Sequence, residues 1–97
     1  MVYSPYIVSL EAFAPPGQSS ETKGIMAVRT KAEWWSTNHD LHSTVAEGPL
    51  EAGVHFAVTF KMDVTLKPQA WPFTLEEIAV YKVADGKIVV EEFFYSV

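Results

Sequence analysis

The sequence has 97 residues, of which 48% are hydrophobic and 13% aromatic, and its 12 acidic and 7 basic residues give a formal charge of -5. This length predicts one compact domain, residues 1–97, with its own hydrophobic core. The absence of cysteine excludes disulfides and thiolate chemistry and favours a cytoplasmic location. Because the basic residues are scattered along the chain, no nucleic-acid or membrane surface is expected.

The first part of the chain is predicted to form a strand, a long loop and the main helix. Residues 6–13, YIVSLEAF, mix β-branched and aromatic residues as short strands do, and the loop-like PPGQSSETKG follows. Residues 24–38 repeat apolar side chains at helical spacing, namely Ile25, Val28, Ala32 and Trp35. Trp34 lies about 100° from Trp35 around this helix, so the two indoles cannot pack on the same surface.

The second part is predicted to be all strand. After a β-branched stretch at 40–46, residues 54–66 alternate apolar and polar side chains, so one face of that strand is apolar and the other wet. Another strand covers 73–83, and Asp85-Gly86 predicts a tight hairpin into IVVEEFFYSV. The predicted fold class is therefore α+β: a curved antiparallel sheet of about five strands packed on one main helix.

Three segments carry a family resemblance: EWWSTNHDLHS, EGPLEAGVHFAVTFKMDVT and EEIAVYKVADGKIVVEEFFY. Over nearly the whole chain, and most specifically in the last hairpin, they resemble the SnoaL-like branch of the nuclear transport factor 2-like superfamily. The resemblance implies a cone, in which a strongly bent sheet wraps around helices beside a pocket and often dimerises. Superfamily members include isomerases, dehydratases, epoxide hydrolases, polyketide cyclases and non-enzymatic binding modules, so the resemblance leaves open whether this chain is an enzyme.

Acid/base chemistry is predicted where the apolar faces of the last two strands point inward. On strand 73–83 that face carries Glu77 and Tyr81. On the last strand, the set Val89, Glu91, Phe93 and Tyr95 is preferred to Ile88, Val90, Glu92 and Phe94, although periodicity alone does not decide.

Glu77 and Glu91 are predicted to be catalytic, since burial raises a carboxylate pKa and phenols donate to a developing oxyanion. The pocket is predicted to hold Trp35, His39, Phe56, Phe60, Tyr81, Phe93 and Tyr95. In the alternative interpretation, the glutamates lie at the rim, paired with a lysine or Arg29, and the tyrosines only pack.

The histidines of His39-Asp40-Leu41-His42 do not predict a metal site. In an extended segment their side chains would leave on opposite faces, so they would not converge on one ion. His39 suits a helix C-terminus, where the dipole favours it, while His42 is retained among the catalytic candidates as a general base. No metal or cofactor is expected, and the sequence has no phosphate-cradling glycine loop. A nucleophilic triad is not expected either, because the chain has no cysteine and no serine lies in a G-x-S-x-G elbow.

Two functions remain open from the sequence. The first is a small apolar-ligand binding domain, with or without isomerase-, dehydratase- or hydrolase-like acid/base chemistry. The second is a non-catalytic dimerising or engineered scaffold, since relatives usually begin with a helix or helical hairpin that is not seen before the first strand here. In that case, apolar residues would form the interface of a homodimer: Tyr6, Met26, Trp34, Trp71 and Phe73.

Overall fold

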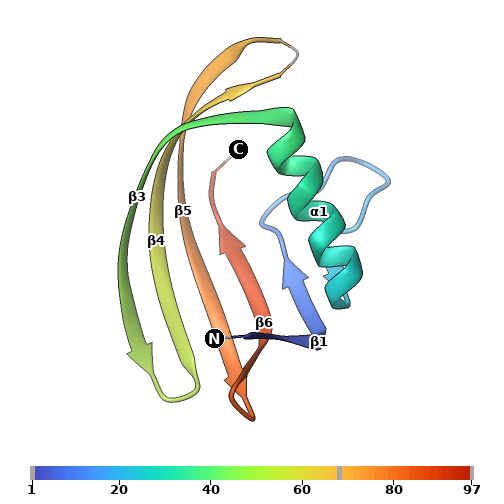
Figure 1. Cartoon of the computed structure of the whole chain (residues 1–97), viewed down its shortest axis with the longest axis vertical. Helices are drawn as coiled ribbons and strands as arrows, with labels where there is room; N and C mark the ends of the chain where they lie inside the picture. Colours follow the sequence, from blue (N-terminus) through green and yellow to red (C-terminus); the bar gives the residue numbers. More distant parts are fainter. Residues whose placement is uncertain (1, 68, 97) are drawn as a thin grey trace.

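The computed structural model describes residues 2–67 and 69–96 as a curved sheet with one helix lying across one face (Figure 1). The elements in chain order are β1 (Val2–Leu10), β2 (Glu21–Lys23), α1 (Ile25–Asn38), β3 (His39–Ala52), β4 (His55–Leu66), β5 (Trp71–Ala84) and β6 (Lys87–Phe94). The predicted α+β class, a curved sheet on one helix, is confirmed. The sheet has six strands, because the short β2 forms within the segment predicted to be loop.

The strand order is β2-β1-β6-β5-β4-β3. Neighbouring strands are antiparallel except β1 and β6, the first and last strands of the chain, which lie side by side and run parallel. Among the described residues, no helix is long and apolar enough to cross a membrane.

The start of α1 is fixed to β1 at Gly24. This residue has a φ of 87°, a conformation that costs glycine little, and its N–H donates to the Ile7 carbonyl at 2.8 Å. One turn later, Val28 is buried against Ile7 and Ile88, so the helix packs on the β1–β6 side of the sheet.

The face of the sheet toward α1, which we call the inner face, is defined by the strand register. Phe56 of β4 lies opposite Tyr81 of β5, which lies opposite Glu91 of β6. Near the β5–β6 turn the register shifts between Lys82 and Val83. Because of this bulge, Ile88 occupies the buried inner position that simple alternation assigns to Val89.

Much of the sheet is not covered by the helix. Among the described residues, the buried hydrophobic side chains are few: Ile7, Val28, Val64, Ala79 and Ile88. Every residue of β3 after His39 is exposed. The exposed residues of β3 include the large apolar side chains Leu41, Val45 and Leu50, and exposed apolar surface is typical of a ligand or protein interaction site.

Replacing Gly86 by alanine is expected to destabilise the β5–β6 hairpin through the backbone alone. Asp85 and Gly86 have φ of 52° and 73°, and a Cβ on Gly86 would meet no atom within 4 Å. Gly86→Ala should therefore lower the free energy of unfolding by about 1–2 kcal/mol, the cost of a left-handed conformation for an L-residue. Chemical denaturation measures this, with exposed Lys87→Ala as the control, and equal midpoints for the two variants would contradict the turn geometry.

Candidate functional site

A hydrogen-bond network lies between α1 and the inner face. Glu91 is only 4% exposed, and it accepts hydrogen bonds from Tyr3 Oη and Ser9 Oγ of β1, both at 2.8 Å. The fully buried Ser9 Oγ in turn accepts a hydrogen bond from Lys31 Nζ of α1. The network therefore joins β6, β1 and the helix.

The same lysine extends the network to the loop after β1. Lys31 Nζ lies 2.9 Å from Glu11 Oε1, and Tyr95 Oη donates to Glu11 Oε2 at 2.8 Å. The ammonium group also lies 5.5 Å from the centroid of the Phe93 ring, a distance at which a cation is attracted to a π face. Both oxygens of Glu11 are thus partnered, as are both oxygens of Glu91.

Glu77 shares the inner face but has no such partner. Glu77 lies opposite Phe60 of β4. Because side chains alternate along a strand, Glu77 points to the same face of β5 as Ala79 and Tyr81. No hydrogen bond or ion pair joins its carboxylate to another side chain in the described part of the chain. Burial, and then the negative charges of Glu11 and Glu91, raise the pKa of Glu77 above its usual 4.5. A half-buried, unpaired carboxylate with a raised pKa is a candidate acid or base.

The tyrosines of the site are held in their protonated form. Burial raises the pKa of Tyr81, and the nearby carboxylates Glu91 and Glu77 raise it further. Burial is also the main cause of the raised pKa of Tyr95, followed by its hydrogen bond to Glu11. These phenols therefore remain hydrogen-bond donors at neutral pH.

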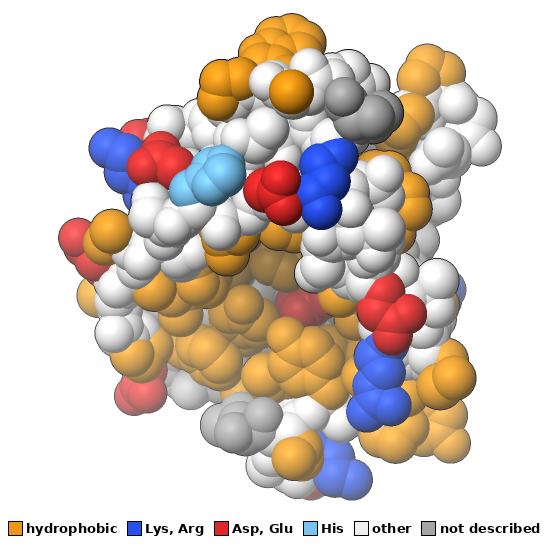
Figure 2. Space-filling view, turned by 45° about the horizontal axis from the view of Figure 1, so that its top comes forward, with side chains coloured by type: hydrophobic (Ala, Val, Ile, Leu, Met, Phe, Trp, Pro, Cys, Tyr) orange, Lys and Arg blue, Asp and Glu red, His pale blue; other side chains and the backbone are white. Residues whose placement is uncertain are grey.

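A hollow opens between α1 and the uncovered part of the inner face, and we call it the interior hollow. Figure 2 shows its walls of hydrophobic side chains, with an acidic side chain visible in its depth. Four of the aromatic residues predicted to form the pocket share this face of the sheet by register: Phe56, Phe60, Tyr81 and Phe93. Phe56 and Tyr81 stack with ring centroids 4.8 Å apart. An apolar, aromatic concavity with few polar groups has the composition of a small-molecule site.

Two further residues of the predicted pocket lie at the C-terminal end of α1. The rings of Trp35 and His39 are stacked with centroids 4.4 Å apart, and His39 Nδ1 lies 2.8 Å from the Trp35 carbonyl oxygen. Since a carbonyl can only accept, this ring nitrogen donates and satisfies one of the free carbonyls at the helix end. Beside them, Trp34 is 61% exposed and lies edge-on to His39.

His42 is not brought together with the interior carboxylates. It lies at a register shift in β3, where its Nε2 is 2.6 Å from Thr65 Oγ1. Thr65 is one of the polar side chains of β4 that alternate with Phe56 and Phe60, and it therefore points away from α1. Nothing in this geometry gives His42 access to the interior hollow.

The predicted interface residues are exposed but do not form one patch. Their exposed fractions are Tyr6 87%, Met26 73%, Trp34 61%, Trp71 66% and Phe73 38%. Tyr6 and Met26 belong to β1 and the first turn of α1, whereas the other three lie near the opposite end of the helix and the start of β5 (Figure 1).

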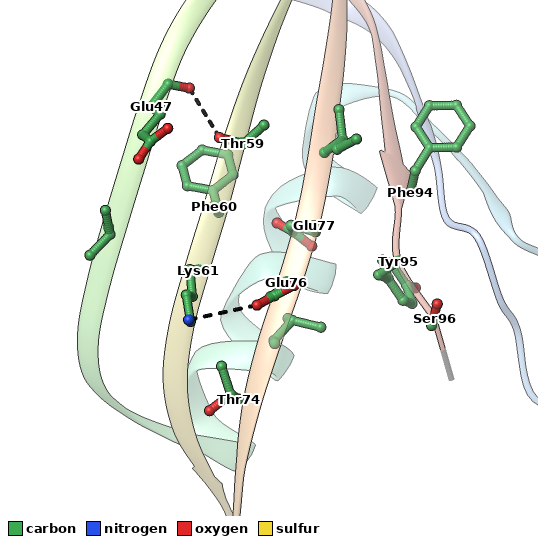
Figure 3. A pocket seen from close by; sticks show the side chains of 13 residues that line it. Glu47, Thr59, Phe60, Lys61, Thr74, Glu76, Glu77, Phe94, Tyr95 and Ser96 are labelled. Carbon is green, nitrogen blue, oxygen red and sulfur yellow. Dashed lines mark hydrogen bonds and ion pairs between the residues drawn. The ribbon is translucent and has the colours of Figure 1, made fainter.

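A groove of about 860 Å³ lies mainly on the outer face of β3 to β6, away from α1. Figure 3 looks onto it, with the Lys61–Glu76 ion pair of 3.7 Å across β4 and β5. Exposed hydrophobic side chains also line it, namely Val45, Ile78 and Phe94. Glu77 and Tyr95 border the groove as well, because β6 ends opposite Ile78 and leaves this edge of β5 without a neighbour.

Sequence reasoning missed four members of the network: Tyr3, Ser9, Glu11 and Lys31. Three of them reach the site through the parallel β1–β6 pairing, for which the sequence has no local signal. Lys31 did leave a signal, since it lies three residues after Val28 and four before Trp35, on the apolar side of the helix. A single charge on an apolar helix stripe indicates a buried polar partner.

A strongly bent sheet wrapped around a helix, with an aromatic hollow and carboxylates inside it, is the cone of the cystatin-like, nuclear transport factor 2-like class. The model of the SnoaL-like domain family matches residues 2–95. The chain belongs to this family.

Solved structures agree with the assignment. A Mesorhizobium loti protein described as a SnoaL-like polyketide cyclase is 38% identical, with a TM-score of 0.90 over 97% of this chain and 79% of that one. A Bacillus subtilis protein described as an isomerase is 19% identical, with a TM-score of 0.85 over 97% and 69%. A ketosteroid isomerase-like protein from Catenulispora acidiphila, in complex with trimethylamine, is 11% identical, with a TM-score of 0.81 over 99% and 71%. The latter two show the fold alone, and no curated protein matches the sequence.

The raised pKa of Glu77 predicts a pH-dependent cost to folding. Between the ordinary value of 4.5 and the raised value, the folded chain binds more protons at this site than the unfolded chain. The free energy of unfolding should therefore fall as pH rises through this window. Glu77→Gln removes the titration, so the variant should be the more stable protein above the window and should lose that advantage below it. Denaturation curves at several pH values test this, and a difference that does not vary with pH would contradict the burial of Glu77.

Proposed function

We propose that this protein binds a small apolar molecule in the interior hollow and transfers a proton on it, with Glu77 as the general acid or base. The observation that carries the proposal is an unpaired, half-buried carboxylate on an aromatic face. A raised pKa brings a carboxyl closer to neutral pH, where a general base is most effective. In isomerase-like chemistry one acid/base group can remove a proton from a molecule and return it to another atom of the same molecule, which suits a single free carboxylate.

The other polar residues have supporting roles in this proposal. Tyr81 shares the inner face with Glu77, and its protonated phenol can donate to an oxygen that gains negative charge. Glu91 and Glu11 have their oxygens occupied by hydroxyl groups and Lys31, so they position the site and add negative charge near Glu77.

The relatives support this type of function. The Mesorhizobium loti protein, at 38% identity, is described as a SnoaL-like polyketide cyclase, which supports a role on a small organic molecule, whereas the Bacillus subtilis protein described as an isomerase supports the fold alone. The trimethylamine complex shows that another protein with this fold holds a small molecule.

A ligand screen read by heteronuclear NMR tests the proposal. Small apolar carbonyl compounds should shift the resonances of inner-face residues such as Tyr81 and Phe93 and leave outer-face Val45 unchanged. Shifts confined to the outer groove would contradict the interior site.

A second candidate function, association through the outer face, is favoured by the exposed Val45, Ile78 and Phe94 along its groove. If two copies pair there, sedimentation velocity at micromolar concentration should show a dimer. Ile78→Lys should dissociate it, because a charge in an apolar interface is costly to bury, and Trp34→Lys should not. A monomeric parent protein would exclude this candidate.

A further inference from the structure

The charges around the interior hollow are unequal. Three carboxylates, Glu11, Glu77 and Glu91, act on one another there, and one ammonium group, Lys31, lies among them. In the described part of the chain, three further lysines form ion pairs with surface carboxylates instead: Lys23, Lys61 and Lys67. When all four groups are ionised, the three carboxylates outnumber the single ammonium group, and negative charge is left in excess at this site.

The ammonium group of Lys31 is not available to form an ion pair with Glu77. Lys31 Nζ is already bonded to Ser9 and Glu11, and it lies over the ring of Phe93. The contact between Lys31 and Phe93 also shows that a cation can lie over an aromatic ring of the inner face. Phe60, directly opposite Glu77, offers another aromatic side chain beside the free carboxylate.

We propose that the interior hollow selects a small organic cation, a tertiary or quaternary ammonium compound, with its charge beside Glu77 and its alkyl groups against the inner-face aromatic rings. This inference rests on the proposed ligand site and narrows its ligand class. An ammonium ion supplies the counter-charge that Glu77 lacks, and its methyl groups match the apolar walls.

The sign of the ligand's charge decides how strongly it is held at this site. An aromatic face attracts a cation, and the Coulomb attraction of a partly buried carboxylate adds to this. An anion of the same shape meets the three carboxylates and is repelled. A neutral molecule of the same shape gains only the apolar contact.

Binding should also depend on pH. Glu77 must be ionised to attract a cation, so affinity should rise as pH increases through the raised pKa of Glu77. The other charged and titratable groups that face the site come from several elements: Tyr3 in β1, Glu11 in the following loop, Lys31 in α1, Tyr81 in β5, and Glu91 and Tyr95 in and after β6.

Three compounds of one shape provide the test: choline, its neutral carbon analogue 3,3-dimethylbutan-1-ol, and the anion 3,3-dimethylbutanoate. Each is titrated into the intact chain and followed by heteronuclear NMR. Choline should bind about tenfold or more tighter than the alcohol, which corresponds to about 1.4 kcal/mol, and the anion should cause no inner-face shifts. Glu77→Gln should reduce the preference for choline over the alcohol to near unity, while Glu76→Gln on the outer face should keep it.

The outcomes separate this inference from the proposed function. If the alcohol or the anion binds the inner face as well as choline does, or if Glu77→Gln keeps the preference, the cation selectivity is wrong while the interior site stands. If none of the three compounds shifts the inner-face resonances but apolar carbonyl compounds do, the cation selectivity is likewise wrong. If no compound of either kind shifts them, the interior site and the inference both fail.

Discussion

Replacing Glu91 by alanine is expected to lower the free energy of unfolding by about 3–5 kcal/mol, because two hydrogen bonds to a buried charge are lost. The substitution leaves the hydroxyl groups of Tyr3 and Ser9 without their acceptor, and Ser9 is fully buried. It also removes the link between β6 and the Ser9–Lys31 contact, because Ser9 Oγ donates to Glu91. For a domain of this size, each kcal/mol corresponds to about 4–8 °C in melting temperature, so thermal unfolding followed by circular dichroism should show the loss clearly.

Two further variants make the Glu91 prediction specific. Glu91→Gln keeps the size and one acceptor oxygen, so it should cost less than alanine. Glu92→Ala changes the next residue on the same strand, which lies opposite Val80 on the other face and takes no part in the network. If Glu91→Ala is no more destabilising than Glu92→Ala, the network does not hold β1, β6 and α1 together as described.

Replacing Glu77 by glutamine is expected to lower kcat by about 10²–10⁴-fold on any substrate that the protein turns over, which is the usual contribution of a general acid or base. The variant keeps the shape of the side chain and loses only the proton-transfer group. KM for a neutral substrate should therefore change much less than kcat.

The neighbouring residue provides the matched control for Glu77. Glu76 points to the outer face and forms an exposed ion pair with Lys61 at 3.7 Å. Glu76→Gln should leave kcat unchanged, because Glu76 does not face the interior hollow and an exposed ion pair contributes little to stability. Equal kcat values for Glu77→Gln and the parent protein would show that Glu77 is not the catalytic acid or base.

Those parts of the fold that depend on local patterns could be predicted from the sequence. Alternation along residues 54–66 predicted the two faces of β4, and Asp85-Gly86 predicted the hairpin, because side-chain period and turn conformation are properties of short segments. The parallel pairing of β1 with β6 could not be predicted in this way. It depends on contacts between residues more than 80 positions apart, such as Ser9 and Glu91, and no short window contains both.

The residues of the candidate site likewise fall into those that a local pattern predicts and those that depend on long-range pairing. Glu77 and Tyr81 follow from alternation on a single strand, so the sequence placed them on one face. The partners of Glu91 could not be anticipated, because Tyr3 and Ser9 reach it only through the long-range pairing. His42 was kept as a candidate general base because of its imidazole, and its position could not be predicted, since the register shift in β3 and the contact with Thr65 are not visible in the local sequence.

The most direct test of the interior site is a crystal structure of the protein with a ligand from the NMR screen. We expect density between α1 and the inner face, with a polar ligand atom within hydrogen-bond distance of Glu77 and the apolar part against Phe60 and Phe93. Density in the outer groove alone, over Val45 and the Lys61–Glu76 pair, would contradict it.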